Sequence, residues 1–454
     1  MRSVKSSLLF GSHTHHMPQH TKRHKRLAIV IVCLALVFIF SALGISAVLP
    51  KSSPASQRLS EAASKQTLSS TDQYIWSYQE VVGNEPDNLD AHATLAWLYL
   101  QKARETADPA YYSKAEALLD AALKQDARHV ESLIGKGSLA LARHQFQEAL
   151  TLGEQARSIN PHIARVYGVL ADAYTELGRY DQAVEATQTM VDLRPDLSSY
   201  SRVAYARELH GDLDGAVEAM GQAVRAGGPN AENTEWTRVQ LGNLYLAKGQ
   251  LDAAEKTYRE ALLRLPNYVY AQAGLARMYA ARGESDQAIQ LYQQAIERMP
   301  LAEFVVGLGE TLEAAGRTEE AQQQYALVKA MQQLQQSNGV DIDMELALFE
   351  ADHGDPQLAL KLAQQAYVRR PGIRGAEALA WAQYRAGQFA EAQQSMKQAM
   401  KLGTQDATLF YRAGMIAQAA GDQRTAQEYL RLALQLNPYF SILYAPQARA
   451  ALGR

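Results

Sequence analysis

The sequence predicts an all-α protein: a superhelical solenoid of about ten antiparallel helix pairs, preceded by one transmembrane helix. Two observations predict this fold. A pattern of apolar and small residues with a period near 34 recurs through most of the 454-residue chain, and an uncharged apolar run lies near its start. Because one short helix pair has an apolar face with nothing to cover it, each pair needs copies of itself on either side.

The clearest copy of the pattern is residues 164–197. Its apolar and small residues recur at helical spacing in two stretches, one before and one after Gly178. Gly178 separates the two stretches, and Pro195 ends the second. This segment therefore predicts two short helices joined by a tight turn.

Two small residues recur in register in all ten copies. Small side chains at these positions allow the two helices of a pair to cross closely. The position in the second helix is occupied by Ala115, Ala149, Ala183, Ala216, Ala254, Ala288, Ala321, Ala359, Ala392 and Ala426. The position in the first helix is occupied by Ala96, Gly137, Ala171, Ala204, Gly242, Ala276, Gly309, Ala347, Ala380 and Gly414.

Glycine and proline mark the ends of the predicted helices. A glycine at the turn favours the left-handed conformation that ends a helix. We expect that conformation at Gly178, Gly211, Gly249, Gly283, Gly316, Gly354, Gly387 and Gly421. Second helices are stopped by Pro161, Pro195, Pro266, Pro300, Pro371 and Pro438.

The pattern Leu241, Gly242, Tyr245, Gly249, Ala254, Tyr258, Ala261, Pro266 resembles the tetratricopeptide repeat (TPR) family. The next copy, Leu275, Ala276, Tyr279, Gly283, Ala288, Tyr292, Ala295, Pro300, has the same resemblance. The resemblance covers roughly residues 89–438. It implies a right-handed superhelix whose first helices line a concave groove, and it implies no catalysis.

The N-terminal segment predicts a membrane anchor. Residues 1–26 form a basic, His-rich tail, and residues 27–49 carry no charge. At about 1.5 Å per residue, the apolar run would span a bilayer core, and it is longer than the apolar region of a cleaved signal peptide. The cluster of positive charge at 22–26 places the N-terminus in the cytoplasm and the repeats on the other side of the membrane.

The other segments follow from composition and register. Residues 50–70, rich in Ser, Ala, Gln and Lys, predict a linker. Residues 71–88 fit the second helix of a degenerate capping repeat, 89–438 form the solenoid, and 439–454 form a C-terminal capping helix.

Composition and residue spacing argue against several functions. Beyond the tail, 39 basic residues face 48 acidic ones, so clustered positive charge for nucleic-acid binding is not expected. Outside the tail, His144, His210 and His353 fall at turns between helices, and His129 and His162 fall at junctions between repeats. The single cysteine, Cys33, lies in the apolar run. We therefore expect that the protein is not an enzyme and that its solenoid has no cofactor or metal site.

The resemblance places the partner-binding residues on the concave face of the first helices. There, aromatic and arginine side chains are the ones that contribute most to interfaces. The predicted groove consists of Trp97, Tyr205, Trp236, Asn243, Tyr270, Arg277, Trp381, Tyr384 and Arg385. Glu176, Glu208 and Arg374 occupy equivalent positions.

Several of the aromatic residues could instead pack between adjacent first helices. The lysines of the clamp that binds terminal carboxylates in some relatives are missing.

The predicted function is a membrane-anchored, non-catalytic scaffold or assembly factor that binds a protein or peptide partner in the groove. Two alternatives stay open. A groove lined with Trp and Tyr can also stack sugars, which would make the protein an envelope polysaccharide binder. The His-rich tail could handle metal ions, since neutral imidazole is a good ligand.

Overall fold

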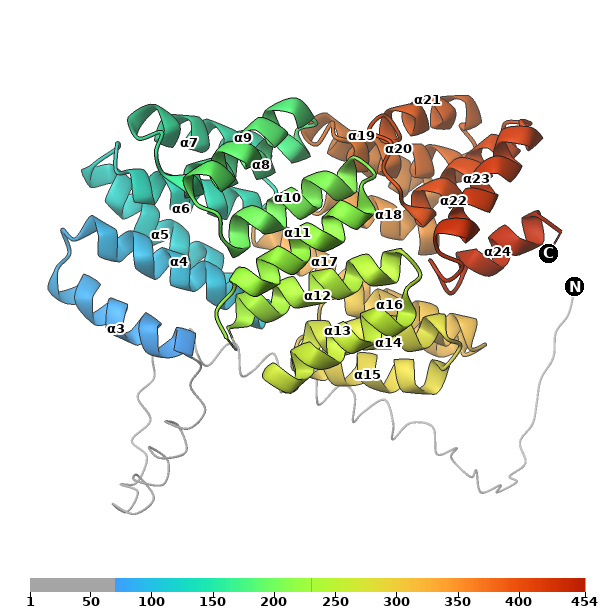
Figure 1. Ribbon diagram of the computed structural model, residues 1–454, viewed down its shortest axis with the longest axis horizontal. Coiled ribbons are helices and arrows are strands. Elements are labelled where there is room, and N and C mark those ends of the chain that lie inside the picture. The colour runs from blue at the N-terminus through green and yellow to red at the C-terminus, as the bar shows by residue number, and fades with distance from the viewer. Residues whose placement is uncertain (1–69, 230, 454) are drawn as a thin grey trace, which may run out of the picture. The chain divides into compact units, whose positions relative to one another are not determined.

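The computed structural model describes residues 70–229 and 231–453, all within the compact unit Ser69–Arg454. These residues form 22 helices and no strands (Figure 1). The helices are α3 (Ser70–Asn84), α4 (Leu89–Thr106), α5 (Ala110–Gln125), α6 (Val130–Ala142), α7 (Phe146–Ile159), α8 (Ala164–Glu176), α9 (Tyr180–Leu193), α10 (Leu197–Leu209), α11 (Leu213–Ala226), α12 (Glu232–Ala247), α13 (Leu251–Arg264), α14 (Val269–Ala281), α15 (Ser285–Arg298), α16 (Ala302–Ala314), α17 (Thr318–Ser337), α18 (Asp343–His353), α19 (Pro356–Arg369), α20 (Ile373–Arg385), α21 (Phe389–Ala399), α22 (Ala407–Ala419), α23 (Gln423–Leu436) and α24 (Tyr444–Ala451).

The helices stack as consecutive pairs, from α4 with α5 to α22 with α23. Successive pairs pack on each other, and α17 meets α18 through side chains, with Tyr325 stacked on His353 and Lys329 paired with Glu350. An all-α solenoid is therefore confirmed. The helix count is larger than ten pairs provide, because α3 precedes the first pair and α24 follows the last. Of these two end helices, α3 packs on α4, and α24 packs on α23 and also contacts α18 and α22 through Tyr444 and Gln447.

The predicted close crossing of the two helices in a pair is confirmed. A Cβ atom added at Gly242 would lie 2.4 Å from the Tyr258 ring, and one at Gly309 would lie 2.5 Å from the Tyr325 ring. The alanines Ala254 and Ala288 of the second helices are fully buried. Small residues thus let a large side chain fill the space between adjacent helices.

The turn prediction is confirmed at seven of its eight glycines and wrong at one. Gly178, Gly211, Gly249, Gly283, Gly316, Gly387 and Gly421 have positive φ angles between 67° and 85°. Gly354 has a φ of −138°, which is outside the left-handed region. Gly354 follows α18, and only here among the described pairs does a proline, Pro356, occupy the first position of the second helix. A proline favours extended backbone in the residue before it, and Asp355 has a ψ of 113°, so the chain turns differently there.

Between residues 70 and 453, apart from the undescribed residue 230, no helix is long and apolar enough to cross a membrane. The predicted tail at 1–26, the membrane helix at 27–49 and nearly all of the linker at 50–70 lie outside the described residues.

The superhelix closes on itself along a seam, which we define as the contacts between the turns of the second to fifth pairs and the loops that border α18, α20, α22 and α23. Across it, the Ile373 amide donates to the Tyr180 hydroxyl (2.6 Å) and Thr404 donates to the Leu209 carbonyl (2.5 Å). Asn437 donates to the Leu246 carbonyl at 2.9 Å. These partners are 191 to 195 residues apart, so one superhelical turn takes under six repeats.

Candidate functional site

The solenoid encloses a cavity of about 1180 Å³, which we call the interior cavity. Its wall is built by the end of α4, by α10, α12, α14 and α16 to α18, and by the segments 404–408 and 437–442. First helices of the pairs and loops from the next superhelical turn therefore meet around one space. The volume exceeds the 300–1,000 Å³ that is usual for small-molecule sites.

Three of the nine predicted groove residues meet in this cavity: Asn243, Tyr270 and Arg277. The Asn243 side-chain oxygen accepts from Arg277 (2.7 Å) and from the Tyr258 hydroxyl (2.8 Å). Burial and the carboxylates of Glu303 and Glu232 raise the pKa of Tyr270, so its hydroxyl stays protonated. Arg277 keeps its guanidinium open to the cavity.

Three other predicted residues, Trp381, Tyr384 and Arg385, line a smaller cavity of about 220 Å³. Trp381 is 1% exposed, donates its indole N–H to Asp352 at 2.6 Å and stacks on Tyr384 with ring centres 4.8 Å apart. Its side chain thus has almost no surface to offer a partner. Asp352 also lines the interior cavity, so the two spaces adjoin.

The remaining three, Trp97, Tyr205 and Trp236, pack against buried clusters and line neither of the two cavities. Burial, and then the carboxylate of Glu176, raises the pKa of Tyr205 to about 12. These three aromatic residues therefore pack against neighbouring helices, which is the alternative to a place in the groove.

The sequence prediction named Glu208 but passed over the other acidic members of the cavity wall. Glu303 and Glu310 lie 33 residues after Tyr270 and Arg277, at the same positions of the next pair, and both line the cavity. The repeat register could have identified them, but a criterion based on aromatic residues and arginine excluded them. Gln332 and Phe440 come from longer helices or loops and carry no such signal.

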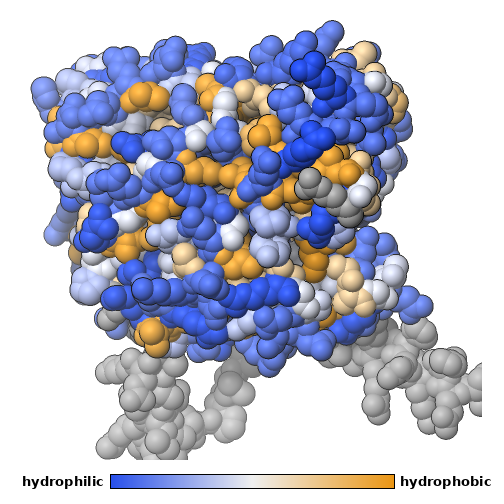
Figure 2. Space-filling view, turned by 45° about the vertical axis from the view of Figure 1, so that its right-hand side comes forward, coloured by the Kyte–Doolittle hydropathy of each residue, from blue (hydrophilic) through white to orange (hydrophobic). Residues whose placement is uncertain are grey.

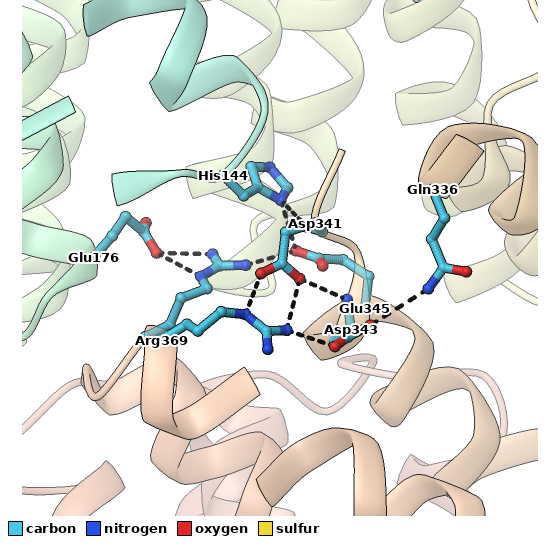
Figure 3. A network of polar contacts seen from close by, with 8 residues as sticks. His144, Glu176, Gln336, Asp341, Asp343, Glu345 and Arg369 are labelled. Carbon is cyan, nitrogen blue, oxygen red and sulfur yellow. Dashed lines mark hydrogen bonds and ion pairs between the residues drawn. The ribbon is translucent and has the colours of Figure 1, made fainter. Parts of the chain in front are cut away.

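A polar network closes one part of the seam beside the cavity (Figure 3). Arg370, only 9% exposed at its side chain, bonds Glu176 of α8 (2.7 Å) and Glu345 of α18 (3.0 Å). The His144 ring donates to the Asp341 carbonyl at 2.7 Å, and Arg369 bonds the Asp341 and Asp343 carboxylates. Glu176, predicted as a groove residue, instead joins two superhelical turns.

Outside the cavity, the exposed large apolar side chains of the described residues come from several helices. The most exposed large apolar side chains there are Leu263 (83%) and Val368 (82%), and they lie on different pairs. On the face shown in Figure 2, hydrophobic residues form separate patches among hydrophilic ones. Scattered apolar residues of this kind are normal for a protein surface.

The helix pairs, their common register and the concave cavity define a helical-repeat fold. Three family models, each described as a tetratricopeptide repeat, match this chain: one at 140–207, one at 111–162 and 239–303, and one at 407–440. These matches support the TPR family, as the resemblance implied.

One curated relative is the small glutamine-rich tetratricopeptide repeat-containing protein 2 of Saccharomyces cerevisiae. It is 30% identical over 102 residues, which are 22% of this chain and 30% of that protein. The chain therefore matches under a third of the relative's length.

Among solved structures, the human IFIT1 dimer with PPP-AAAA is 13% identical, with 82% of this chain and 95% of that chain covered and a TM-score of 0.44. A thermophilic TPR protein of Thermus thermophilus is 22% identical, with 44% and 96% covered and a TM-score of 0.35. Likenesses of this degree do not indicate ligands or partners.

Proposed function

We propose that this chain is a non-catalytic protein-interaction scaffold that holds a segment of a partner protein in the interior cavity. The observation that carries the proposal is the cavity itself, at about 1180 Å³ and lined by first helices of many pairs. A space of this size suits a peptide segment better than a metabolite. Tyr270, Arg277 and Asn243 supply the aromatic, charged and amide groups that interfaces use.

The contacts of the titratable groups support a binding role over a catalytic one. His144 is engaged by the Asp341 carbonyl, and His353 lies 3.2 Å from Glu310. Asp352 accepts from the Trp381 indole and from the Tyr444 hydroxyl. Each of these contacts satisfies a buried or half-buried polar group of the fold, so the positions of these side chains need no catalytic role to explain them.

We also propose that the scaffold is anchored in the inner or plasma membrane by residues 27–49, with the N-terminus in the cytoplasm and the repeats outside. The uncharged run and the basic cluster before it support this arrangement. Protease added outside sealed cells should then digest the repeats and spare the tail. Protected repeats would contradict the topology.

The scaffold proposal is tested by filling the cavity. Ala281 lines the wall at the end of α14, so Ala281→Trp places an indole in the cavity. This block is steric, so it should act on a ligand of any charge. Ala330→Trp adds the same side chain at an exposed position of α17. After cross-linking in intact membranes, partners should be lost from Ala281→Trp and retained by Ala330→Trp. Partners retained by both variants, with both folded by circular dichroism, would place the binding surface elsewhere.

A further inference from the structure

The interior cavity is rich in carboxylates. Seven acidic residues line it against two arginines, Arg104 and Arg277, although the whole chain has nearly equal numbers of the two signs. The acidic residues are Asp108, Glu208, Glu303, Glu310, Glu345, Asp352 and Asp406.

Three of the seven are neutralised by arginines that do not line the cavity. Glu345 pairs with Arg370, Asp352 with Arg412 and Asp406 with Arg374. The other four, Asp108, Glu208, Glu303 and Glu310, form no ion pair with Lys or Arg within the described part of the chain. One of the two wall arginines, Arg104, is itself bound to Glu232 at 2.7 Å.

One of these four carboxylates, that of Glu208, lies in surroundings that penalise its charge. Burial raises the pKa of Glu208, and nearby Asp406 adds to the effect while Arg374 opposes it. The Glu303 carboxylate contributes to the raised pKa values of Tyr270 and Tyr292 after their burial. An excess of negative charge in a partly desolvated space is relieved by a cation entering it.

A second observation points to a ligand that donates hydrogen bonds. Gln332 of α17 lines the cavity and is only 5% exposed, yet its side-chain oxygen has no hydrogen-bond partner among the described residues. A buried carbonyl oxygen without a donor is unfavourable, because it has lost its hydrogen bonds to water, so such groups usually have a partner. Lysine and arginine side chains carry only donors, which match both this oxygen and the carboxylates.

We infer that the interior cavity takes a basic segment, with lysine or arginine side chains placed against Glu208 and Glu303 and a donor placed against Gln332. The inference rests on the proposed scaffold function and specifies its ligand. The other wall cation, Arg277, already donates to Asn243. An acidic segment would meet four carboxylates that no Lys or Arg of the described residues pairs with, and only this one guanidinium.

The test is selection of short random peptides displayed on phage, using the full-length protein in detergent. Wild type is compared with Glu208→Gln/Glu303→Gln and with Glu297→Gln/Glu319→Gln. The second pair removes the same charge from exposed positions of α15 and α17 that do not line the cavity. Peptides enriched on wild type are then synthesised and measured by fluorescence polarisation.

We expect the enriched peptides to carry an excess of lysine and arginine. They should bind the cavity double variant at least about tenfold more weakly, bind the surface double variant as wild type, and weaken as salt rises. Enriched peptides that are neutral or acidic, or that ignore Glu208→Gln/Glu303→Gln, would overturn the basic-segment inference and leave the scaffold function standing. No enrichment, together with no cross-linked partner, would overturn both.

Discussion

At the scale of single residues, the Glu208 carboxylate destabilises the fold but is proposed to bind the ligand. Its carboxyl is partly desolvated at the cavity wall, where burial and Asp406 raise its pKa and Arg374 lowers it. Folding therefore favours the protonated form of this group, and its ionised form destabilises the protein at neutral pH. A residue kept at such a cost is typical of a binding site, where stability is often traded for function.

Glu208→Gln should therefore raise the free energy of unfolding at neutral pH, while weakening the binding of basic peptides. The pKa of Glu208 is higher in the folded protein than in the unfolded chain, so wild type regains stability as pH falls through the folded pKa. The difference in the free energy of unfolding between Glu208→Gln and wild type should therefore shrink in acid. Urea unfolding at a series of pH values measures this. Glu319→Gln, at an exposed position, should show no such trend; a destabilised Glu208→Gln at neutral pH would contradict the argument.

His144 occupies the turn position at which seven other pairs have a left-handed glycine, and its φ is 60°. A non-glycine residue in this conformation is strained by about 1–2 kcal/mol. The ring offsets the strain across the seam by donating to Asp341 (2.7 Å), and it stacks on Phe146 with ring centres 5.7 Å apart. The sequence showed only a lone histidine at a turn, because its partner lies 197 residues away.

His144→Ala should destabilise the protein by about 1–3 kcal/mol, because it loses the ring contacts and keeps the strained backbone. His144→Gly loses the same contacts but relaxes the backbone, so it should be the milder change by about 1 kcal/mol. Thermal or urea unfolding of the two variants gives the order. If glycine were worse than alanine, the strain argument would fail.

At the scale of helices, the repeat pattern was sufficient to predict the pairs, because each crossing depends on residues within one pair or its neighbour. Tyr258 is the clearest example: its fully buried ring fits between Gly242 of α12 and Gly274 of α14. A Cβ at either glycine would lie 2.4 or 2.5 Å from the ring. The prediction for Gly354 was wrong because it took no account of Pro356, which favours extended backbone at Asp355.

Replacing glycine by alanine should therefore lower the free energy of unfolding at the helix crossings and raise it at an uncrowded helix position. Gly242→Ala and Gly274→Ala force the Tyr258 ring to move and should destabilise by about 1–3 kcal/mol. Gly221→Ala, within α11, meets only the end of the Arg225 side chain, and should stabilise by about 0.5–1 kcal/mol through helix propensity. Urea unfolding of the three variants tests both signs, and stabilisation at Gly242 would refute the crossing argument.

At the scale of the whole 69–454 unit, the sequence did not predict that successive superhelical turns touch. The repeat period describes each pair and its neighbours, whereas the seam joins residues about 190 apart through the small rotation that each repeat adds. Gly211 shows the consequence: beyond its φ of 82°, a Cβ there would lie 2.4 Å from the Gly403 carbonyl oxygen. The cavity follows from this closure, so the acidic wall residues that loops contribute, such as Asp108 and Asp406, could be recognised only with the structure.

The seam also predicts that this solenoid resists opening more than a chain of repeats that contact only their neighbours. In Arg370→Met, Glu176 and Glu345 lose the guanidinium between them, while Arg369 still holds Asp341. Two partly buried carboxylates left without a cation should destabilise the closed form by about 1–3 kcal/mol.

Hydrogen exchange of the full chain can locate that opening. The amide N–H groups of Asp341 and Ile373 donate across the seam, at 3.1 and 2.6 Å, so peptides that contain them should exchange faster in Arg370→Met. Peptides from α14 and α15 should exchange as in wild type, because those helices make none of the seam contacts described above. Arg317→Ala, which removes an exposed pair with Glu320, is the control and should change neither region.

Faster exchange everywhere would indicate global destabilisation. Unchanged exchange at both amides would show that closure does not depend on Arg370, and that the backbone contacts of the seam are sufficient to hold the two turns together.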